Sequence, residues 1–311
     1  MIDANKDSST VKLPGARLWI VLGISTVLLF YYILPFFALQ QYAHVQNFQA
    51  NDTDLQRVAV AASSNKLVCI VAVGRKESLQ AVSHNIYRHF SGWDCIVFVW
   101  ASEYDLSSNN SKEFQKIANM CTIKRHENMN WGDFLFKISP AMLKEKRYAY
   151  VAILLDDVWL PSKGNHVVLV PRLLARMAKN NIDVASPAVW GAHRDTTMPK
   201  KWPSNKCIMS VHYVEIFFTI YTVDMWLCLY NTLLDKNNSG GWCYDKCLKL
   251  KCGGTHGIDY TMVAQHLQAK PPFFSAGMVP HVGTDGNLAL CKRYGCTSFI
   301  QKHDTPLECY F

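Results

Sequence analysis

The sequence has no basic block of the kind that nucleic-acid-binding proteins carry. Its 32 Lys and Arg residues are scattered in ones and twos, although the formal net charge is +8. Nucleic-acid binding depends on clustered cations that contact phosphates, so this distribution excludes it as the expected function. A mildly basic surface remains compatible with small anionic substrates such as nucleotide phosphates.

Internal repeats and low-complexity tracts are also missing. Of the 311 residues, 50% are hydrophobic, which is enough for a real core in one large or two small domains. The composition therefore indicates a folded, globular protein rather than a disordered chain.

Charged residues are absent from 18–39. A helix of this length rises about 1.5 Å per residue and spans the roughly 30 Å of a bilayer core. Three basic residues precede the run: Lys6, Lys12 and Arg17. No Lys or Arg follows until Arg57, so the positive-inside rule places the tail 1–17 in the cytosol and the bulk of the chain in a lumen.

We therefore expect a single-pass type II membrane protein of the Golgi or endoplasmic reticulum. Its signal anchor is 18–39, its polar stem 40–65 and its lumenal domain 66–311. A cleaved signal peptide is the alternative. However, the apolar run exceeds the roughly 7 to 15 residues of such a core, and no small-x-small cleavage site follows it.

Glycosylation acceptors and cysteines fit an oxidising lumen. Triplets of the form Asn-x-Ser/Thr begin at Asn51, Asn109 and Asn237, each in a polar stretch that should be exposed. Six of the 11 cysteines lie in the last quarter of the chain, so disulfides are the first interpretation. Cys69 and Cys95 lie inside apolar runs, where a thiol usually serves as a small core side chain.

A zinc site is the alternative for part of the cysteine set. Its ligands would be Cys243, Cys247, Cys252 and His256. The spacing matches no strong zinc signature, and an oxidising lumen disfavours free thiolates.

Apolar runs and helical patterns alternate from residue 66 onward. Strands are expected at 66–74, 94–100, 121–126, 150–155 and 183–189, and helices at 77–90, 113–120, 131–146 and 167–181. Such alternation predicts an α/β domain with a mostly parallel, doubly wound sheet that helices cover on both faces.

The segment 215–234 is apolar enough to be considered as a second transmembrane span. Asp224 near its middle would then cost about 2.5 to 3.5 kcal/mol or more. A buried strand that leads into a helix, with Asp224 near the helix start, is less costly, and we expect that arrangement.

Two adjacent carboxylates, Asp156 and Asp157, follow the expected strand "YVAILL". Ligands of such sheets bind outside the carboxyl ends of the strands. Adjacent Asp side chains there offer hard oxygen ligands for Mn²⁺ or Mg²⁺, and such an ion bridges the phosphates of a nucleotide-sugar and stabilises the departing diphosphate. The alternative is that one Asp caps the turn and the other is solvated.

Four blocks of the sequence, in order, resemble domain-of-unknown-function family 707. They are 131–160, 184–189, 214–233 and 257–265, and the likeness covers about 68–286. The resemblance implies a nucleotide-diphospho-sugar transferase fold of the GT-A-like kind behind a single N-terminal anchor. The family has no agreed reaction, so a fold is implied more directly than an activity.

The acidic turn departs from the family pattern. That pattern reads Trp-Asp-Glu-Asp-Leu, so Asp156 and Asp157 match its first two acids whereas Val158 replaces the third. If the third acid is a ligand in the family, this chain coordinates its metal differently or not at all. The segments 257–259 and 214–215 match the family's Gly-Leu-Asp and Val-Glu blocks.

Five further residues are candidates for the site. Asp259 follows the loop "GGTHG" and is expected to open a helix; within about 3 Å of an acceptor hydroxyl it would be the general base, and its alternative role is a helix N-cap. Glu215 is the rival base, or a member of a structural ion pair. His281 is a candidate metal ligand, with ordinary hydrogen bonding as the alternative. Trp131 and Lys137 would meet the base or phosphate of a nucleotide, although their helical face serves equally as a core face.

Together these features predict a lumenal, metal-dependent glycosyltransferase that moves a sugar from a nucleotide-sugar donor to a glycan or other acceptor. The competing hypothesis is a glycosyltransferase-like domain that has lost its chemistry and binds a carbohydrate or a partner, for which Val158 is the best evidence. Only the enzyme predicts Mn²⁺-dependent nucleotide binding. A metal-dependent hydrolase would need more ligands near Asp156 than the sequence offers.

Overall fold

The structure is a computed structural model that describes eleven segments of the chain. They are 52–74, 78–99, 112–126, 129–164, 167–190, 208–238, 240–241, 243–267, 289, 291–296 and 309–310. The expected anchor at 18–39 and the candidates Asn51, Asn109 and His281 lie outside these residues. Among the helices within them, none is long and apolar enough to cross a membrane.

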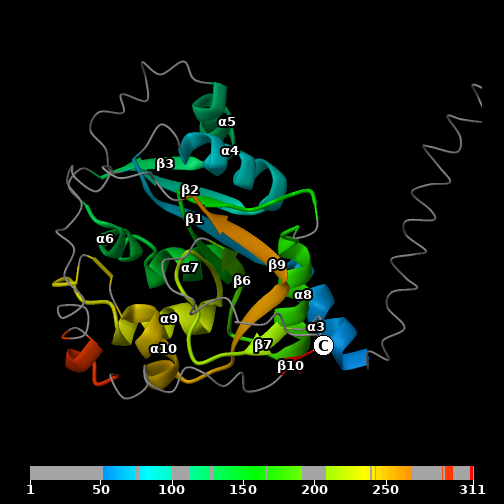
Figure 1. Ribbon diagram of the computed structural model, residues 1–311, viewed down its shortest axis with the longest axis vertical. Helices are drawn as coiled ribbons and strands as arrows, with labels where there is room; N and C mark the ends of the chain where they lie inside the picture. The colour runs from blue at the N-terminus through cyan, green and yellow to red at the C-terminus, as the bar shows by residue number, and fades with distance from the viewer. Residues whose placement is uncertain are drawn as a thin grey trace, which may run out of the picture. The chain divides into compact units, whose positions relative to one another are not determined.

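Helices and strands alternate along most of the described chain (Figure 1). The helices are α3 (Asp52–Ser63), α4 (Ser78–His89), α5 (Lys112–Met120), α6 (Trp131–Leu135), α7 (Pro140–Lys146), α8 (Val170–Asn180), α9 (Val223–Thr232) and α10 (Tyr244–Cys252). The strands are β1 (Asn65–Val73), β2 (Asp94–Val99), β3 (Thr122–Arg125), β4 (Tyr148–Leu155), β5 (Val158–Trp159), β6 (Val184–Trp190), β7 (Ile208–Ser210), β8 (Phe218–Thr222), β9 (His256–His266) and β10 (Cys309–Tyr310).

The strands form one mixed sheet in the order β10-β7-β9-β6-β8-β4-β1-β2-β3, with β5 paired to β9 beside this path. The expected mostly parallel pairing is wrong, because five of the nine strand pairs among the described residues are antiparallel. β8 runs antiparallel to both β4 and β6, and β5, β7 and β10 also join antiparallel. An apolar run marks a buried strand but carries no information on its direction. Since β8 is antiparallel to both of its neighbours, β1, β2, β3, β4, β6 and β9 still point the same way. We call the end of the sheet where these six strands finish its carboxyl end.

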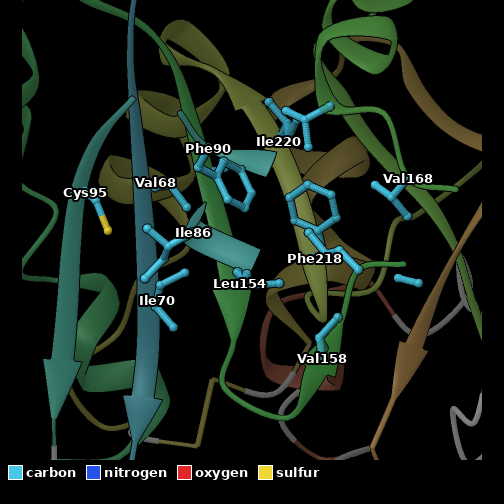
Figure 2. Packing of buried hydrophobic residues seen from close by; sticks show 14 of the residues in the cluster. Val68, Ile70, Ile86, Phe90, Cys95, Leu154, Val158, Val168, Phe218 and Ile220 are labelled. Carbon is cyan, nitrogen blue, oxygen red and sulfur yellow. The ribbon is translucent and has the colours of Figure 1, made fainter. Parts of the chain in front are cut away.

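Helices pack on both faces of the sheet, as the alternating pattern predicts. The core of one face includes apolar side chains of α4, α5 and α8, and the core of the other includes those of α6, α7, α9 and α10. Figure 2 shows the first core, where Phe90 and Phe218 meet edge to face, with ring centroids 5.8 Å apart, near Val68 and Ile86. Such cores require strands that are apolar on both sides, which explains the uninterrupted apolar runs.

The expected helix at 131–146 is two helices, α6 and α7, rather than one. Pro140 has no backbone N–H to continue a helix and is favoured in the first turn of a new one. Ser139 caps α7, because its Oγ accepts a hydrogen bond from the Met142 N–H at 3.4 Å. The pair Ser139-Pro140 is therefore a helix start that the sequence interpretation overlooked.

The strand and helix expected within 215–234 are confirmed as β8 and α9. Thr222 is the N-cap of α9, and its hydroxyl accepts from the Met225 N–H. Asp224 lies exposed in the first turn, where a negative charge complements the helix dipole.

Within the segment assigned to the stem, residues 52–63 form α3, which packs beside α8 (Figure 1). Ala61 on α3 is buried in the first core. The compact unit that contains the sheet begins at Asp52.

Disulfides connect most of the cysteines that the structure describes. The pairs are Cys95–Cys121, Cys228–Cys252, Cys243–Cys291 and Cys247–Cys296. Cys69 is a free, buried core thiol, as expected, whereas Cys95 is bonded to Cys121. Cys95 is the second residue of β2, and Cys121 immediately precedes the parallel strand β3. The zinc alternative is wrong, since all three of its cysteines are in disulfides.

Candidate functional site

The acid pair lies at the carboxyl end of the sheet. Asp156 and Asp157 form the turn between β4 and β5, and β4 is flanked by β1 and β8. The chain then turns back into β5, where Val158 pairs with His266 at the end of β9. The turn therefore occupies the place where ligands bind in sheets of this kind.

Asp156 is held toward β1 and α4. Asp156 is only 6% exposed. Its Oδ2 accepts a hydrogen bond from Ser78 Oγ at 2.7 Å and one from the Gly74 N–H at 3.4 Å. These donors stabilise the ionised carboxylate and fix its direction.

Asp157 meets a histidine that the sequence interpretation missed. Asp157 Oδ2 lies 3.2 Å from His266 Nε2, and both side chains remain slightly exposed. The Leu267 N–H donates to the Asp157 carbonyl at 2.7 Å, and the Phe217 ring packs against the His266 ring at 4.7 Å. The pattern "VAQH", in which His ends a strand, is the only local signal for His266.

Carboxylate oxygen and imidazole nitrogen are both suitable donors for Mn²⁺. Among the residues that the structure describes, no group of three or more His, Cys, Asp or Glu forms a potential metal site. Asp157 and His266 thus make a two-donor set. This number fits ions that bind through one or two protein ligands and take their remaining ligands from phosphates and water.

Glu215 lies in the loop before β8, at the same end of the sheet as the acidic turn. The Leu155 N–H donates to the Phe217 carbonyl at 3.0 Å, which brings the loop before β8 to the end of β4. Glu215 is two residues upstream in that loop, is partly exposed, and its carbonyl accepts from Thr219 Oγ1 at 2.9 Å. The fold therefore brings this carboxylate to the same end of the sheet as Asp157.

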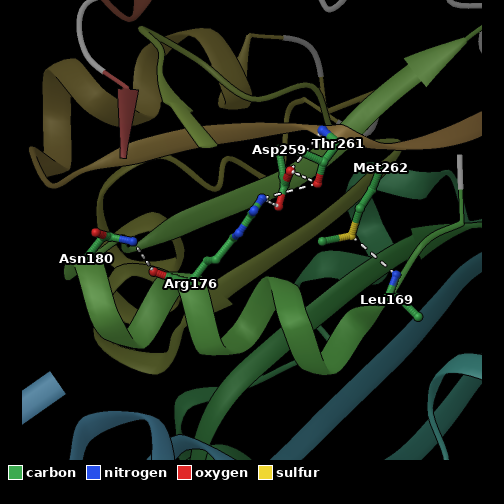
Figure 3. A network of polar contacts seen from close by, with 6 residues as sticks. All are labelled: Leu169, Arg176, Asn180, Asp259, Thr261 and Met262. Atoms are coloured by element: carbon green, nitrogen blue, oxygen red, sulfur yellow. Dashed lines mark hydrogen bonds and ion pairs between the residues drawn. The ribbon is translucent and has the colours of Figure 1, made fainter. Parts of the chain in front are cut away.

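Asp259 lies inside β9, so the expectation that it opens a helix is wrong. The next residues along the strand include Tyr260, Thr261 and Val263, and residues of these types favour strands. The Asp259 side chain has no exposed area and forms an ion pair with Arg176 of α8 at 2.5 Å (Figure 3). Thr261 donates from its hydroxyl and its N–H to Asp259 Oδ1. An acceptor hydroxyl cannot reach a carboxylate enclosed in this way.

This ion pair supports an irregularity in β9. The register with β6 changes between Pro187, which pairs with Asp259, and Ala188, which pairs with Val263. Extra residues in one strand bend that strand and change the direction of its remaining residues. Asp259 therefore contributes to the path of the strand end that carries His266.

Trp131 packs against a glycine. A Cβ placed on Gly241 would lie 2.5 Å from the Trp131 ring, and Gly241 has a φ of +64°. Lys137 lies close enough to His126 that its charge, after burial, helps to lower the pKa of that imidazole. Substrate contacts of these two side chains stay predictions, and the core-face alternative describes the packing of Trp131.

Asp245 is a carboxyl that the sequence interpretation did not consider. It lies in the first turn of α10, is partly buried, and burial raises its pKa. Because its raised pKa is the only feature that points to a catalytic role, Asp245 is a group to test rather than a member of the site. In the sequence, Asp245 follows "GGWCY", and no motif there indicates a catalytic role.

Asn237 is the glycosylation acceptor that the structure describes. It is exposed in a turn, and its N–H donates to Asp235 Oδ1 at 2.9 Å. The site is therefore accessible, and its modification stays a prediction.

No protein-family model and no curated protein sequence matches the chain. Solved structures that resemble it include GalNAc-T7 with UDP, GalNAc and Mn²⁺, at 12% identity and a TM-score of 0.47 over 78% of this chain and 55% of that one. S. aureus TarS matches at 10% identity and a TM-score of 0.44, over 76% and 43%. The mannosyltransferase PcManGT from Pyrobaculum calidifontis, in complex with GDP-Man and Mn²⁺, matches at 10% and 0.47, over 82% and 84%.

The chain spans about half the length of the first two of these proteins. At TM-scores this low, the likenesses assign no residue and no activity to it.

Proposed function

We propose that the chain is a metal-dependent glycosyltransferase that moves a sugar from a nucleotide-sugar donor to a glycan or other acceptor. The observation that carries the proposal is the contact between Asp157 and His266 at the carboxyl end of the sheet. There the parallel strands β1 to β4 finish side by side, which is where nucleotides bind in α/β sheets.

Each residue near the turn has a distinct role in this proposal. Asp157 and His266 would hold Mn²⁺ or Mg²⁺, which neutralises charge on the departing diphosphate when bound. Asp156, held by Ser78, orients the turn from the side of α4. Glu215 would accept the proton of the acceptor hydroxyl.

The compartment is part of the proposal. Four disulfides among the described cysteines favour an oxidising environment. Together with the apolar run at 18–39, they support a type II protein of the Golgi or endoplasmic reticulum with its bulk in the lumen.

One observation favours the competing function, a binding module without activity. Val158, which replaces the third acid of the resembling family, is fully buried in the first core. The third acidic position is therefore filled by a core side chain in this chain, and no third carboxylate stands next to Asp157 in β5.

The test is turnover by the full chain purified in detergent. We would measure release of nucleoside diphosphate from a panel of nucleotide-sugars, with and without Mn²⁺, for the wild type, Glu215→Gln and Asp245→Asn. Asp224→Asn removes an exposed carboxylate on α9 and is the matched control.

The enzyme predicts Mn²⁺-dependent release that Glu215→Gln abolishes and Asp224→Asn leaves unchanged. Loss in Asp245→Asn alone would transfer the base role to Asp245. Absence of both nucleoside diphosphate release and Mn²⁺-dependent nucleotide binding in the wild type would support the binding module instead.

A further inference from the structure

Helix α4 contacts the residues after the acidic turn through buried polar groups. Asn85 Nδ2 donates to the Val158 carbonyl at 2.6 Å, and the Leu160 N–H donates to Asn85 Oδ1 at 3.0 Å. Asn85 has no exposed area. A buried amide side chain is expensive unless its donor and acceptor are both used, and here each is used on the same short segment.

These two hydrogen bonds have the same pattern as the backbone hydrogen bonds between neighbouring strands. β5 pairs with β9 along one side, where Val158 is opposite His266. Its other side would present backbone N–H and C=O groups that need partners when buried. The Asn85 amide supplies one donor and one acceptor at residues 158 and 160, as a neighbouring strand would. Asn85 thus completes the pairing of β5.

Other residues of helix α4 form hydrogen bonds on either side of the turn. Ser78 in its first turn donates to Asp156 Oδ2 at 2.7 Å. His84 and His89 both bring Nε2 to the Leu160 carbonyl oxygen, at 3.2 and 2.7 Å. One helix therefore holds the chain on both sides of the acidic turn: Ser78 contacts Asp156, and Asn85 and the two histidines contact residues 158 to 160.

We propose that Asn85 is a positioning residue for Asp157: it fixes the backbone just after the turn, so that the Asp157 carboxylate meets His266. The inference rests on the function proposed above. The ladder between β5 and β9 includes the Val158–His266 pair and the hydrogen bond from the Leu267 N–H to the Asp157 carbonyl. A loosened Val158 therefore displaces both donors of the metal site.

The experiment compares Asn85→Ala with Asn238→Ala in the full chain. Asn238 is the matched control, because its amide is also buried, at 3% exposure, and donates to Tyr294 at 3.1 Å on the other face of the sheet. The first readout is the dissociation constant of Mn²⁺ alone. The second is hydrogen exchange of the Leu160 and Leu267 amides, with amides of β1 as reference. Asn85→Ser retains a short hydroxyl and replaces the Ala variant if that variant does not fold.

We expect Asn85→Ala to weaken Mn²⁺ binding by about 10 to 100-fold, as loss of a group that orients a metal ligand does, and to speed exchange of both amides. Asn238→Ala should change neither. Equal weakening in both variants, or unchanged exchange at Leu160 and Leu267 in Asn85→Ala, would overturn the inference. If the wild type binds no Mn²⁺, the proposed function loses its metal site, and the exchange readout alone decides whether Asn85 holds the turn.

Discussion

Asp157 and His266 lie 109 residues apart in the sequence and 3.2 Å apart in the fold. The contact exists because the chain reverses after Asp157 and β5 runs antiparallel to the end of β9. Asp157 and His266 come from separate segments, and the pairing of β5 with β9 brings them together. The candidate site is therefore a product of strand pairing, and changes that alter the course of β9 or β5 should alter it.

The Arg176–Asp259 ion pair should be important for stability. Arg176→Met leaves the Asp259 carboxylate buried without its cation, and we expect a loss of about 3 to 5 kcal/mol in the free energy of unfolding. Urea unfolding measures it. Asn180→Ala, which removes an amide that donates to the Arg176 carbonyl on the same helix, is the control and should cost far less.

The double variant Arg176→Met/Asp259→Leu removes both charges and should recover much of that loss. Wild-type stability of the Arg176→Met variant would contradict the importance of the buried contact between Arg176 and Asp259.

His256 should make the fold sensitive to acid. Burial, with a smaller effect of the Lys249 charge, lowers its pKa from 6.5 to about 3. Between these values the unfolded chain binds a proton that the folded chain does not, so stability is complete above about pH 6.5 and falls as the pH drops. At pH 5 the loss is about 2 kcal/mol.

Urea unfolding at pH 7 and pH 5 checks this pH dependence. His256→Leu should flatten it. His84→Gln, at a partly exposed histidine whose pKa burial also lowers, should reduce the pH dependence less. Identical pH dependence in the wild type and His256→Leu would show that His256 is not the group responsible.

Gly241 should not tolerate a side chain. Its φ of +64° disfavours L-residues, and a Cβ would lie 2.5 Å from the Trp131 ring, so Gly241→Ala should cost about 1 to 3 kcal/mol. Gly92→Ala is the control, because Gly92 has a φ of +81° with nothing within 4 Å of its Cβ position. Equal losses in the two variants would mean that the Trp131 contact adds nothing to the backbone strain.

The disulfide between Cys95 and Cys121 should stabilise the parallel half of the sheet. It closes a loop with a sequence separation of 26, so the Cys95→Ala/Cys121→Ala variant should lose about 3 kcal/mol. Mass spectrometry of non-reduced peptides should find this pair linked and Cys69 as a free thiol that is alkylated only after unfolding. A linkage between Cys69 and any other cysteine would contradict the arrangement.

Several elements could be predicted from the sequence because local patterns encode them. Uninterrupted apolar runs define β1, β2 and β4, since both sides of each strand are buried. The acid pair after β4 was predictable as a candidate site for the same reason, because it ends such a run. The helix after β8 was predictable from Asp224, which is costly in a membrane and favourable near a helix start.

Other features depend on pairing between distant segments. The reversal of β8 leaves no mark on its apolar pattern, and Asp259 after a glycine loop resembles an N-cap until its partner Arg176 is known. His266 can be recognised as a partner of Asp157 only once the pairing of β5 with β9 is known. The bond between Cys95 and Cys121 likewise depends on the pairing of β2 with β3.

The most direct test of the proposed site is thermal stabilisation of the full chain by nucleoside diphosphates and nucleotide-sugars, with and without Mn²⁺. A ligand at 100 times its dissociation constant adds about 2.7 kcal/mol to the folded state. We predict stabilisation that requires both Mn²⁺ and one class of nucleotide and that Asp157→Asn and His266→Ala each abolish. An unchanged melting curve with every ligand, or stabilisation that survives in both variants, would contradict the assignment of Asp157 and His266 as the metal site of a glycosyltransferase.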